Sequence, residues 1–290
     1  YLLDTIDAEI NDKRTYATIR CKDVMCAEEL CSIKKYGYRE DAMKITPESA
    51  AKAYEELLRT ARVEIMFEGC GDPTLAKDIF AQKFAGVKRE PIVLSRSLVK
   101  AQQGAVKEET ERMDVKQGKL VMGFRVEGIE DYRRMNMARI TFALFGGTAN
   151  SLLFKNVREK MSLCYYCSSG YDRSNSIMMV SSGVEAENAQ KARDEVLHQL
   201  EMLKNGEFTD RELEETKLFI RTALMATSDS LGAMDSWYLA QTVGGSEVSP
   251  DMEIELSAQV SREDVIWVAN HTHLDTVYML MPNENQKEAE

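Results

Sequence analysis

Apolar residues in the first ninety positions recur in patterns that predict helices and one strand. Residues 2–31 contain neither proline nor glycine and carry apolar side chains at helical spacing, which predicts one long helix. Residues 46–60 open with a hydroxyl, a proline and an acid, which is typical of a helix start. Residues 63–67 alternate as in a strand. An aspartate followed by proline then opens a helix over residues 72–84.

The rest of the chain predicts a mixture of strands and helices. Alternating apolar side chains predict strands, and apolar side chains three and four residues apart predict helices. The expected strands cover residues 105–115, 119–127, 163–171, 176–185 and 276–281. The expected helices cover residues 130–144, 149–160, 187–204 and 210–230, and a last one begins after Ser261. Thr209 and Glu212 have the spacing of a capping box, and residues 242–250 read as a loop rich in Gly and Ser.

A helix followed by a strand occurs twice along the chain. Residues 45–68 show a hydroxyl cap, a helix and a strand, and residues 260–281 repeat that order. A repeat at this distance indicates duplication of a whole domain. We therefore expect residues 1–90 to be the C-terminal part of a first domain and residues 91–290 to be a complete second one. The chain opens without Met, and the missing part of the first copy would lie before Tyr1.

The composition and the net charge of the chain disfavour some classes of binding partner. The 290 residues are 44% hydrophobic and 29% charged, with a net charge of -11. A negative chain is a poor match for nucleic acid or an anionic membrane. No apolar run approaches the roughly 20 residues of a transmembrane helix. The six cysteines are scattered like cytosolic thiols, not like a disulfide framework, so we expect a cytoplasmic protein.

The segment from Arg158 to Tyr165 is the strongest candidate for a binding site. A helix is expected to end near Lys160 and a strand to begin near Leu163, so the arginine and the tyrosine flank one corner. Arginine offers a planar fork of donors that suits a peptide carbonyl or a developing oxyanion, and a tyrosine hydroxyl adds an uncharged donor. The alternative is that Arg158 stabilises a helix end and Tyr165 packs on the sheet.

This segment resembles the second half of zinc peptidases of the M16 family, the pitrilysin and insulinase type. The resemblance rests on Phe145-Gly-Gly-Thr-Ala-Asn150, on the stretch from Arg158 to Tyr165 and on the duplication, and it extends over nearly the whole chain. It implies an α+β fold of duplicated M16-type α/β domains, each with a mostly antiparallel sheet and helices packed on one face, with the first copy incomplete. It also implies that Arg158 and Tyr165 contact a peptide substrate.

The closest likeness within the family is to bacterial M16-like chains that lack a working zinc motif and pair with a catalytic relative. The family arrangement places two similar halves around a chamber, with the zinc on the half opposite Arg158. Ser162 stands where the family usually has glycine, so the corner is expected to differ there.

A zinc site is expected to be incomplete in this chain. Catalytic zinc needs two or three imidazoles, a carboxylate and an open position, and the helical His-x-x-Glu-His motif is absent. We interpret His198 as a surface residue, and His271 and His273 as a helix-to-strand corner. The resemblance implies that Glu9 is a distal zinc ligand if further ligands lie before Tyr1. The alternative is a pair between Glu9 and Lys13 on an exposed helix.

We therefore expect no cofactor in this chain, with zinc possible in the intact protein or in a partner. Other motifs read as structural. Cys164 and Cys167 have C-x-x-C spacing, but residues three apart on a strand point to opposite faces. The three cysteines between residues 21 and 31 do not line one helix face. Gly146 and Gly147 lack the Lys-Ser/Thr pair of a phosphate loop and are expected to let two helices join closely.

Two functions are compatible with these features. The first is an M16 metallopeptidase-like chain that supplies the substrate-facing half of a peptide-hydrolysing chamber and is inactive alone. Its partners would be a peptide and either a catalytic M16-like chain or the missing N-terminal segment. The second is a non-enzymatic structural or peptide-binding subunit of an active peptidase. An oxidoreductase is disfavoured, because no Gly-rich dinucleotide fingerprint follows a strand.

Overall fold

The chain forms two units that alternate along the sequence. The computed structural model describes residues 1–93, 101 and 104–283. Unit 1 comprises Tyr1–Asp7, Lys34–Arg96 and Met225–Pro250, and unit 2 comprises Ala8–Ile33, Ser97–Leu224 and Asp251–Glu290. Residues 8–33 therefore belong with the second unit, so the units do not coincide with a division near residue 90. That division, which concerns duplicated domains, stays a prediction.

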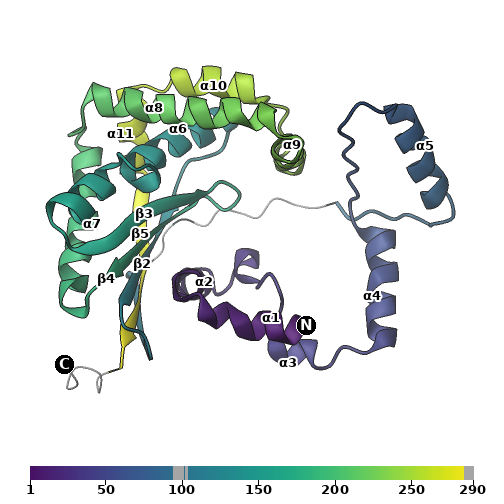
Figure 1. The fold of residues 1–290 in the computed structure, drawn as a ribbon, viewed down its shortest axis with the longest axis horizontal. Helices are drawn as coiled ribbons and strands as arrows, with labels where there is room; N and C mark the ends of the chain where they lie inside the picture. Colours follow the sequence, from purple (N-terminus) through teal and green to yellow (C-terminus); the bar gives the residue numbers. More distant parts are fainter. Residues whose placement is uncertain (94–100, 102–103, 284–290) are drawn as a thin grey trace. The chain divides into compact units, whose positions relative to one another are not determined.

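A five-stranded sheet with the order β1-β5-β2-β4-β3 forms the frame of unit 2 (Figure 1). The strands are β1 (Lys107–Met113), β2 (Gly118–Val126), β3 (Cys164–Asp172), β4 (Ile177–Val184) and β5 (Thr272–Pro282). Only β1 and β5 are parallel among these pairs, and the other three pairs are antiparallel. The predicted α+β class and the mostly antiparallel sheet are confirmed. β5 separates β1 from β2, so the last described strand lies inside the sheet and not at its edge.

One face of the sheet is covered by a layer of helices, as predicted (Figure 1). This layer contains α6 (Tyr132–Phe142), α7 (Ala189–Lys204), α8 (Asp210–Met225), α10 (Pro250–Ala258) and α11 (Arg262–Asn270). Alternate side chains of β2, Leu120, Met122 and Phe124, are buried. Because successive strand residues point to opposite faces, one set of β2 side chains can fill the core beneath this layer.

The opposite face of the sheet carries α2 (Lys13–Met25), which the expectation of helices on one face did not include. Ala17 and Cys21 of α2 pack in one buried cluster with Val121 and Tyr278. Gly123 permits this close approach, because a Cβ atom there would lie 2.7 Å from the Met25 sulfur. Both faces of the sheet are therefore buried where α2 lies.

The single long helix predicted over residues 2–31 is wrong. The structure has α1 (Leu2–Ala8), a 3-10 turn η1 (Glu9–Asn11), α2, and a second 3-10 turn η2 (Leu30–Ser32). The Asp12 carboxylate accepts hydrogen bonds from the backbone amides of Arg14 and Thr15, both 3.1 Å long. Aspartate at this position starts a new helix by capping it, since its side chain competes with the backbone of a continuous helix.

Unit 1 contains α1 apart from its last residue, α3 (Arg39–Ala42), α4 (Pro47–Thr60), α5 (Pro73–Phe84), a 3-10 turn η6 (Ala226–Asp229) and α9 (Leu231–Gly244). The predicted start of α4 is confirmed: Thr46 and Ser49 form a capping box. The strand predicted over residues 63–67 is wrong, because no strand is assigned there. A strand needs a neighbour for its backbone groups, and the described residues offer this segment none.

The helices α9 and α10 were not predicted. Ser230 caps α9, whose end is set by Gly245 in the left-handed region, with φ +69°. α10 begins at Pro250, so residues 245–249 are all that remain of the expected loop. Within the described ranges, no helix has the length and apolar character that crossing a bilayer requires.

Candidate functional site

The corner, which we define as residues 158–165, joins a helical segment to the edge strand of the sheet. The segment η4 (Phe154–Lys160) is a π-helix. It ends where the Met161 amide donates to the Asn156 carbonyl and the Leu163 amide donates to the Val157 carbonyl, both at 3.1 Å. Between these bonds Ser162 adopts φ +51°. A left-handed residue followed by an amide bonded back to the helix is a common helix stop, and it turns the chain directly into β3.

Two hydrogen bonds anchor η4 to the helix layer. Asn156 donates to Gln199 of α7 at 2.7 Å, and Lys155 donates to Glu212 of α8 at 3.2 Å. The Glu212 carboxylate also accepts a hydrogen bond from the Thr209 amide, and the Glu212 amide donates one to the Thr209 hydroxyl. These two bonds confirm the predicted capping box. Residues held from one side in this way leave the other side of the helical turn free. Arg158 is exposed there, with its guanidinium 4.5 Å from the centre of the Phe154 ring.

A β-bulge at the start of β3 displays Tyr165. Cys164 pairs with Val184 and Tyr166 pairs with Gly183, so Tyr165 is an extra residue without a cross-strand partner. Its side chain is 64% exposed. Its hydroxyl donates to Glu185, and this hydrogen bond together with the negative charge of Glu185 raises the pKa of Tyr165. The tyrosine therefore stands out from the sheet, as bulged residues at sheet edges often do.

The same bulge changes the placement of the two cysteines. The prediction that Cys164 and Cys167 point to opposite faces is wrong, because the extra residue moves Cys164 onto the side of Cys167, and their thiols are hydrogen-bonded. The hydrogen bond donated by Cys167 lowers the pKa of Cys164 to about 7, with further lowering by Ser182 and the charge of Arg158. The same pairing and burial raise the pKa of Cys167 well above its ordinary value.

The structure thus brings Arg158 close enough to the start of β3 for its charge to act on Cys164, the neighbour of Tyr165. Chemically the corner offers an exposed, permanently charged fork of donors, a tyrosine and the edge of a sheet. An edge strand presents unpaired backbone groups that an extended chain can pair with. The arrangement can therefore bind a peptide backbone.

The remaining candidates lie in other elements of the chain. Glu9 lies in the 3-10 turn η1 and is half-buried, and Lys13 donates to the Met113 sulfur at 3.0 Å. His271 ends α11, where its ring stacks on Trp267 and its Nδ1 lies 2.7 Å from the Trp267 carbonyl. His198 is exposed on α7, as expected.

Gly146 also permits a close contact with the sheet. It lies in a π-helical turn, η3 (Ala143–Gly147). A Cβ atom at Gly146 would lie 2.7 Å from the Ser169 amide of β3. The Ser169 hydroxyl also donates to the Phe142 carbonyl at 2.8 Å. The glycine therefore lets this turn lie directly against β3.

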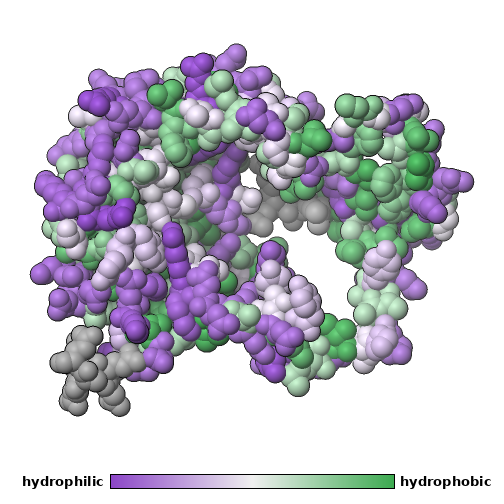
Figure 2. Space-filling view, in the orientation of Figure 1, coloured by the Kyte–Doolittle hydropathy of each residue, from purple (hydrophilic) through white to green (hydrophobic). Residues whose placement is uncertain are grey.

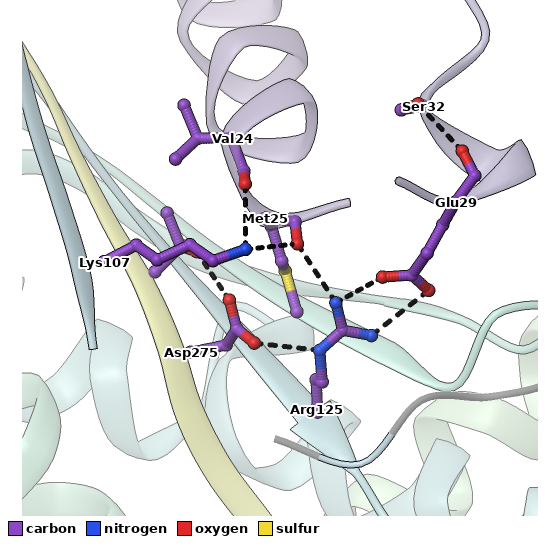
Figure 3. A network of polar contacts seen from close by, with 8 residues as sticks. Val24, Met25, Glu29, Ser32, Lys107, Arg125 and Asp275 are labelled. Atoms are coloured by element: carbon purple, nitrogen blue, oxygen red, sulfur yellow. Dashed lines mark hydrogen bonds and ion pairs between the residues drawn. The ribbon is translucent and has the colours of Figure 1, made fainter. Parts of the chain in front are cut away.

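Within the described part of the chain, one group of three metal-ligand side chains converges: Cys26, Glu29 and Cys31 lie within 4.8 Å of one another. The expectation that these cysteines do not share a face was wrong for this pair, because α2 ends at Met25 and the chain turns back. Both carboxylate oxygens of Glu29 accept from Arg125 (Figure 3). Burial, with the hydrogen bond to Cys31, raises the pKa of Cys26 to about 12. The carboxylate of this group is therefore already paired with Arg125.

Comparison with known proteins identifies the family to which this arrangement belongs. A family model described as "Peptidase M16 inactive domain" matches residues 44–218. The chain belongs to the M16 peptidase family. A curated relative from Bacillus subtilis, named "Probable inactive metalloprotease YmfF", is 27% identical over 283 residues, which is 98% of this chain and 66% of that protein. An "Uncharacterized zinc protease" from Rickettsia bellii is 25% identical over 173 residues.

Solved structures share the fold of this chain. A conserved protein from Enterococcus faecalis matches with a TM-score of 0.87 and 23% identity, covering 97% of this chain and 67% of that one. A peptidase M16 inactive domain from Pseudomonas fluorescens matches with a TM-score of 0.79 and 20% identity, covering 97% and 69%. These neighbours confirm the M16-type fold class. The chain spans 66% of the Bacillus relative and 39% of the rickettsial one.

The M16 family implies zinc, and the residues present do not fit a catalytic zinc site. No His-x-x-Glu-His occurs in the sequence. The two neighbouring histidines do not belong to the one convergent group of ligands found in the described residues, and neither does Glu9. That group contains no imidazole and gives its carboxylate to Arg125. The residues of this chain therefore support no zinc-dependent reaction step by themselves.

Ser182 of β4 and Glu185, the residue after β4, were missed by sequence reasoning, although a signal for them existed. In a hairpin with a turn at residues 173–176, simple register counting places Cys167 opposite Ser182 and Cys164 opposite Glu185. Nothing in the sequence signalled the bulge itself.

Proposed function

We propose that this chain supplies a peptide-holding, non-catalytic wall of an M16-type peptidase. The observation that carries the proposal is the exposed Arg158 at the turn into the edge strand β3, in a chain without the His-x-x-Glu-His motif. Zinc and the general base would belong to another half, held either by a catalytic M16-like chain or by an N-terminal segment of the intact protein. Arg158 and Tyr165 would then bind the substrate from this side.

The chemistry of the corner supports binding of an extended peptide. β3 pairs with β4 on one side, and the described residues contain no strand on its other side. A peptide could add to that edge by main-chain hydrogen bonds. Arg158 would donate two of its N–H groups to a peptide carbonyl or a C-terminal carboxylate, and the charge makes such bonds stronger than neutral ones. Tyr165 would add a neutral donor at the cost of its bond to Glu185.

The names of the relatives support both a partner role and a purely structural one. The rickettsial relatives are named zinc proteases, whereas the Bacillus relative is named a probable inactive metalloprotease. A chain of this second kind would bind peptide or stabilise an assembly without hydrolysis. The six unpaired cysteines support a reducing, cytoplasmic location, and the net charge of -11 disfavours nucleic acid as a partner.

Peptide binding by the corner can be measured directly. Fluorescein-labelled random peptides of twelve or so residues would be titrated with the protein, and binding followed by fluorescence anisotropy. Arg158→Ala is expected to weaken affinity by roughly 10- to 100-fold, because a charged hydrogen-bonding group contributes about 1.5–3 kcal/mol. Tyr165→Phe is expected to weaken it by about fivefold, since it removes one neutral hydrogen bond worth about 1 kcal/mol.

Arg211→Ala is the matched control, because Arg211 is an exposed arginine on α8 that pairs with Glu215. It is expected to leave peptide affinity unchanged, and all three variants are expected to keep the wild-type melting temperature. In an assembly with a catalytic relative, Arg158→Ala should also lower peptide turnover. Unchanged affinity and turnover in a stably folded Arg158→Ala protein would leave the purely structural role as the function of this chain.

A further inference from the structure

Cys164, which lies in the corner, and Cys167, which lies just after it, have the geometry of a disulfide-forming site. Their cross-strand partners, Val184 and Ser182, are two residues apart on β4. Two residues of a strand span about 6.6 Å. The bulge therefore shortens the separation between Cys164 and Cys167 to the upper end of the roughly 4.4–6.8 Å that a disulfide bridges between Cα atoms. In a regular strand, residues three apart would be about 10 Å from one another and could not be joined.

The chemical state of the pair suits thiol–disulfide exchange. Cys167 donates a hydrogen bond to Cys164, and this bond, the Ser182 hydroxyl and the charge of Arg158 lower the pKa of Cys164 to about 7. Near neutral pH Cys164 is therefore partly ionised, while Cys167 keeps its proton. An attacking thiol is most effective when its pKa is close to the ambient pH. Cys164 is 9% exposed and lies inside the corner, between the exposed residues Ser162 and Tyr165, so a small part of it is open to a small reagent.

A second thiol pair in the chain provides a contrast. Cys26 and Cys31 are also hydrogen-bonded, but burial raises the pKa of Cys26 to about 12. Glu29 adds negative charge beside them, and the nearby Arg125 is held between Glu29 and Asp275. Cys26 therefore keeps its proton near neutral pH and is expected to be inert.

We propose that Cys164 and Cys167 form a thiol–disulfide exchange site that reacts with low-molecular-weight disulfides of the glutathione type. The Cys164 thiolate attacks one sulfur of the small disulfide, whose S–S bond breaks and releases one thiolate that takes a proton from water. Cys167 then loses its proton to water and attacks the Cys164 sulfur, which releases the second small thiolate. Two protein thiols are oxidised to one disulfide, and the small disulfide is reduced to two thiols.

Oxidation would act on the peptide-binding corner, and this consequence rests on the proposed function. The disulfide closes a ring that contains Tyr165, so the bulge that displays this tyrosine becomes fixed. It also removes the Cys164 thiolate, which the positive charge of Arg158 stabilises. Peptide affinity is therefore expected to differ between the reduced and oxidised chain.

The exchange reaction can be followed by mass spectrometry independently of peptide binding. The full chain carrying Cys70→Ser, which removes the exposed cysteine, would be incubated with oxidised glutathione near neutral pH. Remaining thiols would be alkylated, and the protein digested and mapped. We expect a disulfide between Cys164 and Cys167 and full alkylation of Cys26 and Cys31. Cys167→Ser should trap one glutathione on Cys164, and Arg158→Ala should slow the reaction about threefold.

Cys26→Ser is the matched control and should leave the exchange rate unchanged. Preferential oxidation of Cys26 and Cys31, or glutathione that remains on Cys164 when Cys167 is present, would overturn the site. Peptide anisotropy with the oxidised chain gives a separate result. If the disulfide forms but peptide affinity does not change, the link to the corner is overturned while the exchange site stands. If the reduced chain binds no peptide, the proposed function fails without affecting the exchange site.

Discussion

Ser162 holds the corner in a conformation that a serine adopts at a cost. Its φ of +51° lies in the left-handed region. For residues other than glycine this region costs on the order of 1 kcal/mol, because the Cβ atom approaches the following carbonyl oxygen. The position is the one at which the M16 resemblance leads us to expect glycine. The shape of the corner is therefore held by the two backbone hydrogen bonds that Met161 and Leu163 donate to η4. The conformational preference of Ser162 itself does not favour it.

Replacing Ser162 with glycine is expected to stabilise the chain. Ser162→Gly removes the Cβ strain but increases the entropy of the unfolded chain, so the net gain should be about 0.5 kcal/mol. Urea unfolding gives the free energy of unfolding directly. Ser162→Ala is the control, because it keeps the Cβ atom and should bring no gain. A stability loss in Ser162→Gly would mean that the serine hydroxyl, and not the backbone, holds the turn.

At this scale the sequence was informative about residue type and uninformative about local geometry. Arg158 and Tyr165 could be found because a helix end and a strand start are visible in the pattern of apolar residues. The bulge could not be found, since one extra residue in a strand leaves the alternation almost unchanged. It decides three features of the site, namely the exposure of Tyr165, its bond to Glu185 and the meeting of Cys164 with Cys167.

At the scale of elements, Arg125 connects three segments that are far apart in sequence (Figure 3). It lies on β2 and is 4% exposed. Its guanidinium is paired with Asp275 of β5 at 2.8 Å and with Glu29, and it also donates to the Met25 carbonyl at the end of α2. The end of α2 is thereby fixed to the centre of the sheet. A buried charge in such a network is costly to remove, because its partners are left uncompensated.

Arg125→Met is therefore expected to destabilise the chain by about 3–5 kcal/mol, since two carboxylates remain near the sheet without their cation. Chemical unfolding followed by circular dichroism measures the change. Arg133→Met serves as the control, because Arg133 is an exposed residue whose contact with Asp264 is 3.4 Å long. Exposed ion pairs contribute less than about 1 kcal/mol. Equal effects of the two substitutions would show that the Arg125 network does not hold α2 to the sheet.

Glu111 forms a second connection between α2 and the sheet, and this one depends on pH. Its carboxylate accepts from Tyr16 of α2 at 2.8 Å and from Tyr278 of β5 at 2.6 Å. Burial tends to raise the pKa of Glu111, but the hydrogen bonds from Tyr278, Tyr16 and Arg20 outweigh it and hold the pKa below its ordinary value. A depressed carboxyl pKa adds stability that is present above the unfolded pKa and is lost as pH falls through the folded pKa.

Glu111→Gln is expected to lower the free energy of unfolding by about 1–2 kcal/mol at neutral pH, since it weakens charge-assisted hydrogen bonds. The difference from the wild type should shrink as pH falls through the folded pKa of Glu111, which lies below its ordinary value, because the native carboxylate then also becomes protonated. Urea unfolding at a series of pH values tests this. Glu109→Gln on the same strand is the control, because its pair with Arg20 is more exposed. A difference that grows in acid would contradict the assignment.

Helices and strands were predictable where packing agrees with local pattern. The five strands of the sheet and the helices α4, α5, α6, α7, α8 and α11 fall close to their expected positions. The misses have local causes. Asp12 interrupts the first helix because it caps the start of α2. The helix α9 was missed because its last residues, which include Gly244, resemble the start of a Gly-rich loop. The segment at residues 63–67 has the alternation of a strand, but a strand exists only when another pairs with it.

At the scale of the whole molecule, the two units differ in how they bury apolar surface. Unit 2 contains all the buried hydrophobic side chains found in the described residues. In unit 1, Val63 and Phe67 are 41% and 45% exposed, and they line a hollow of about 580 Å³ together with Phe80 of α5. Figure 2 shows hydrophobic colouring over the part of the surface that contains α5. Apolar surface of this extent on a monomer is a mark of an interaction site.

The difference predicts unequal stability within one chain. Most helical stability in proteins comes from the packing of an apolar face, and α4 has no buried residue, whereas α7 buries Ala192, Val196 and Leu200. By hydrogen exchange of the isolated chain, amides of α4 and α5 should exchange roughly 100-fold faster than those of α7, which corresponds to about 2.7 kcal/mol in opening free energy. Because α4 and α7 are both helices of similar length, their exchange rates can be compared without a correction for the type of secondary structure.

Amides of β2 provide the second reference, because this strand lies inside the sheet and should match α7 in protection. The exchange pattern also bears on the proposed assembly. If a catalytic M16-like chain covers the hollow, adding it should slow exchange in α5 and leave α7 unchanged, since α7 is already packed. Equal protection of α4 and α7 in the isolated chain would show that unit 1 is stable without a cover, and its exposed apolar residues would then need no partner.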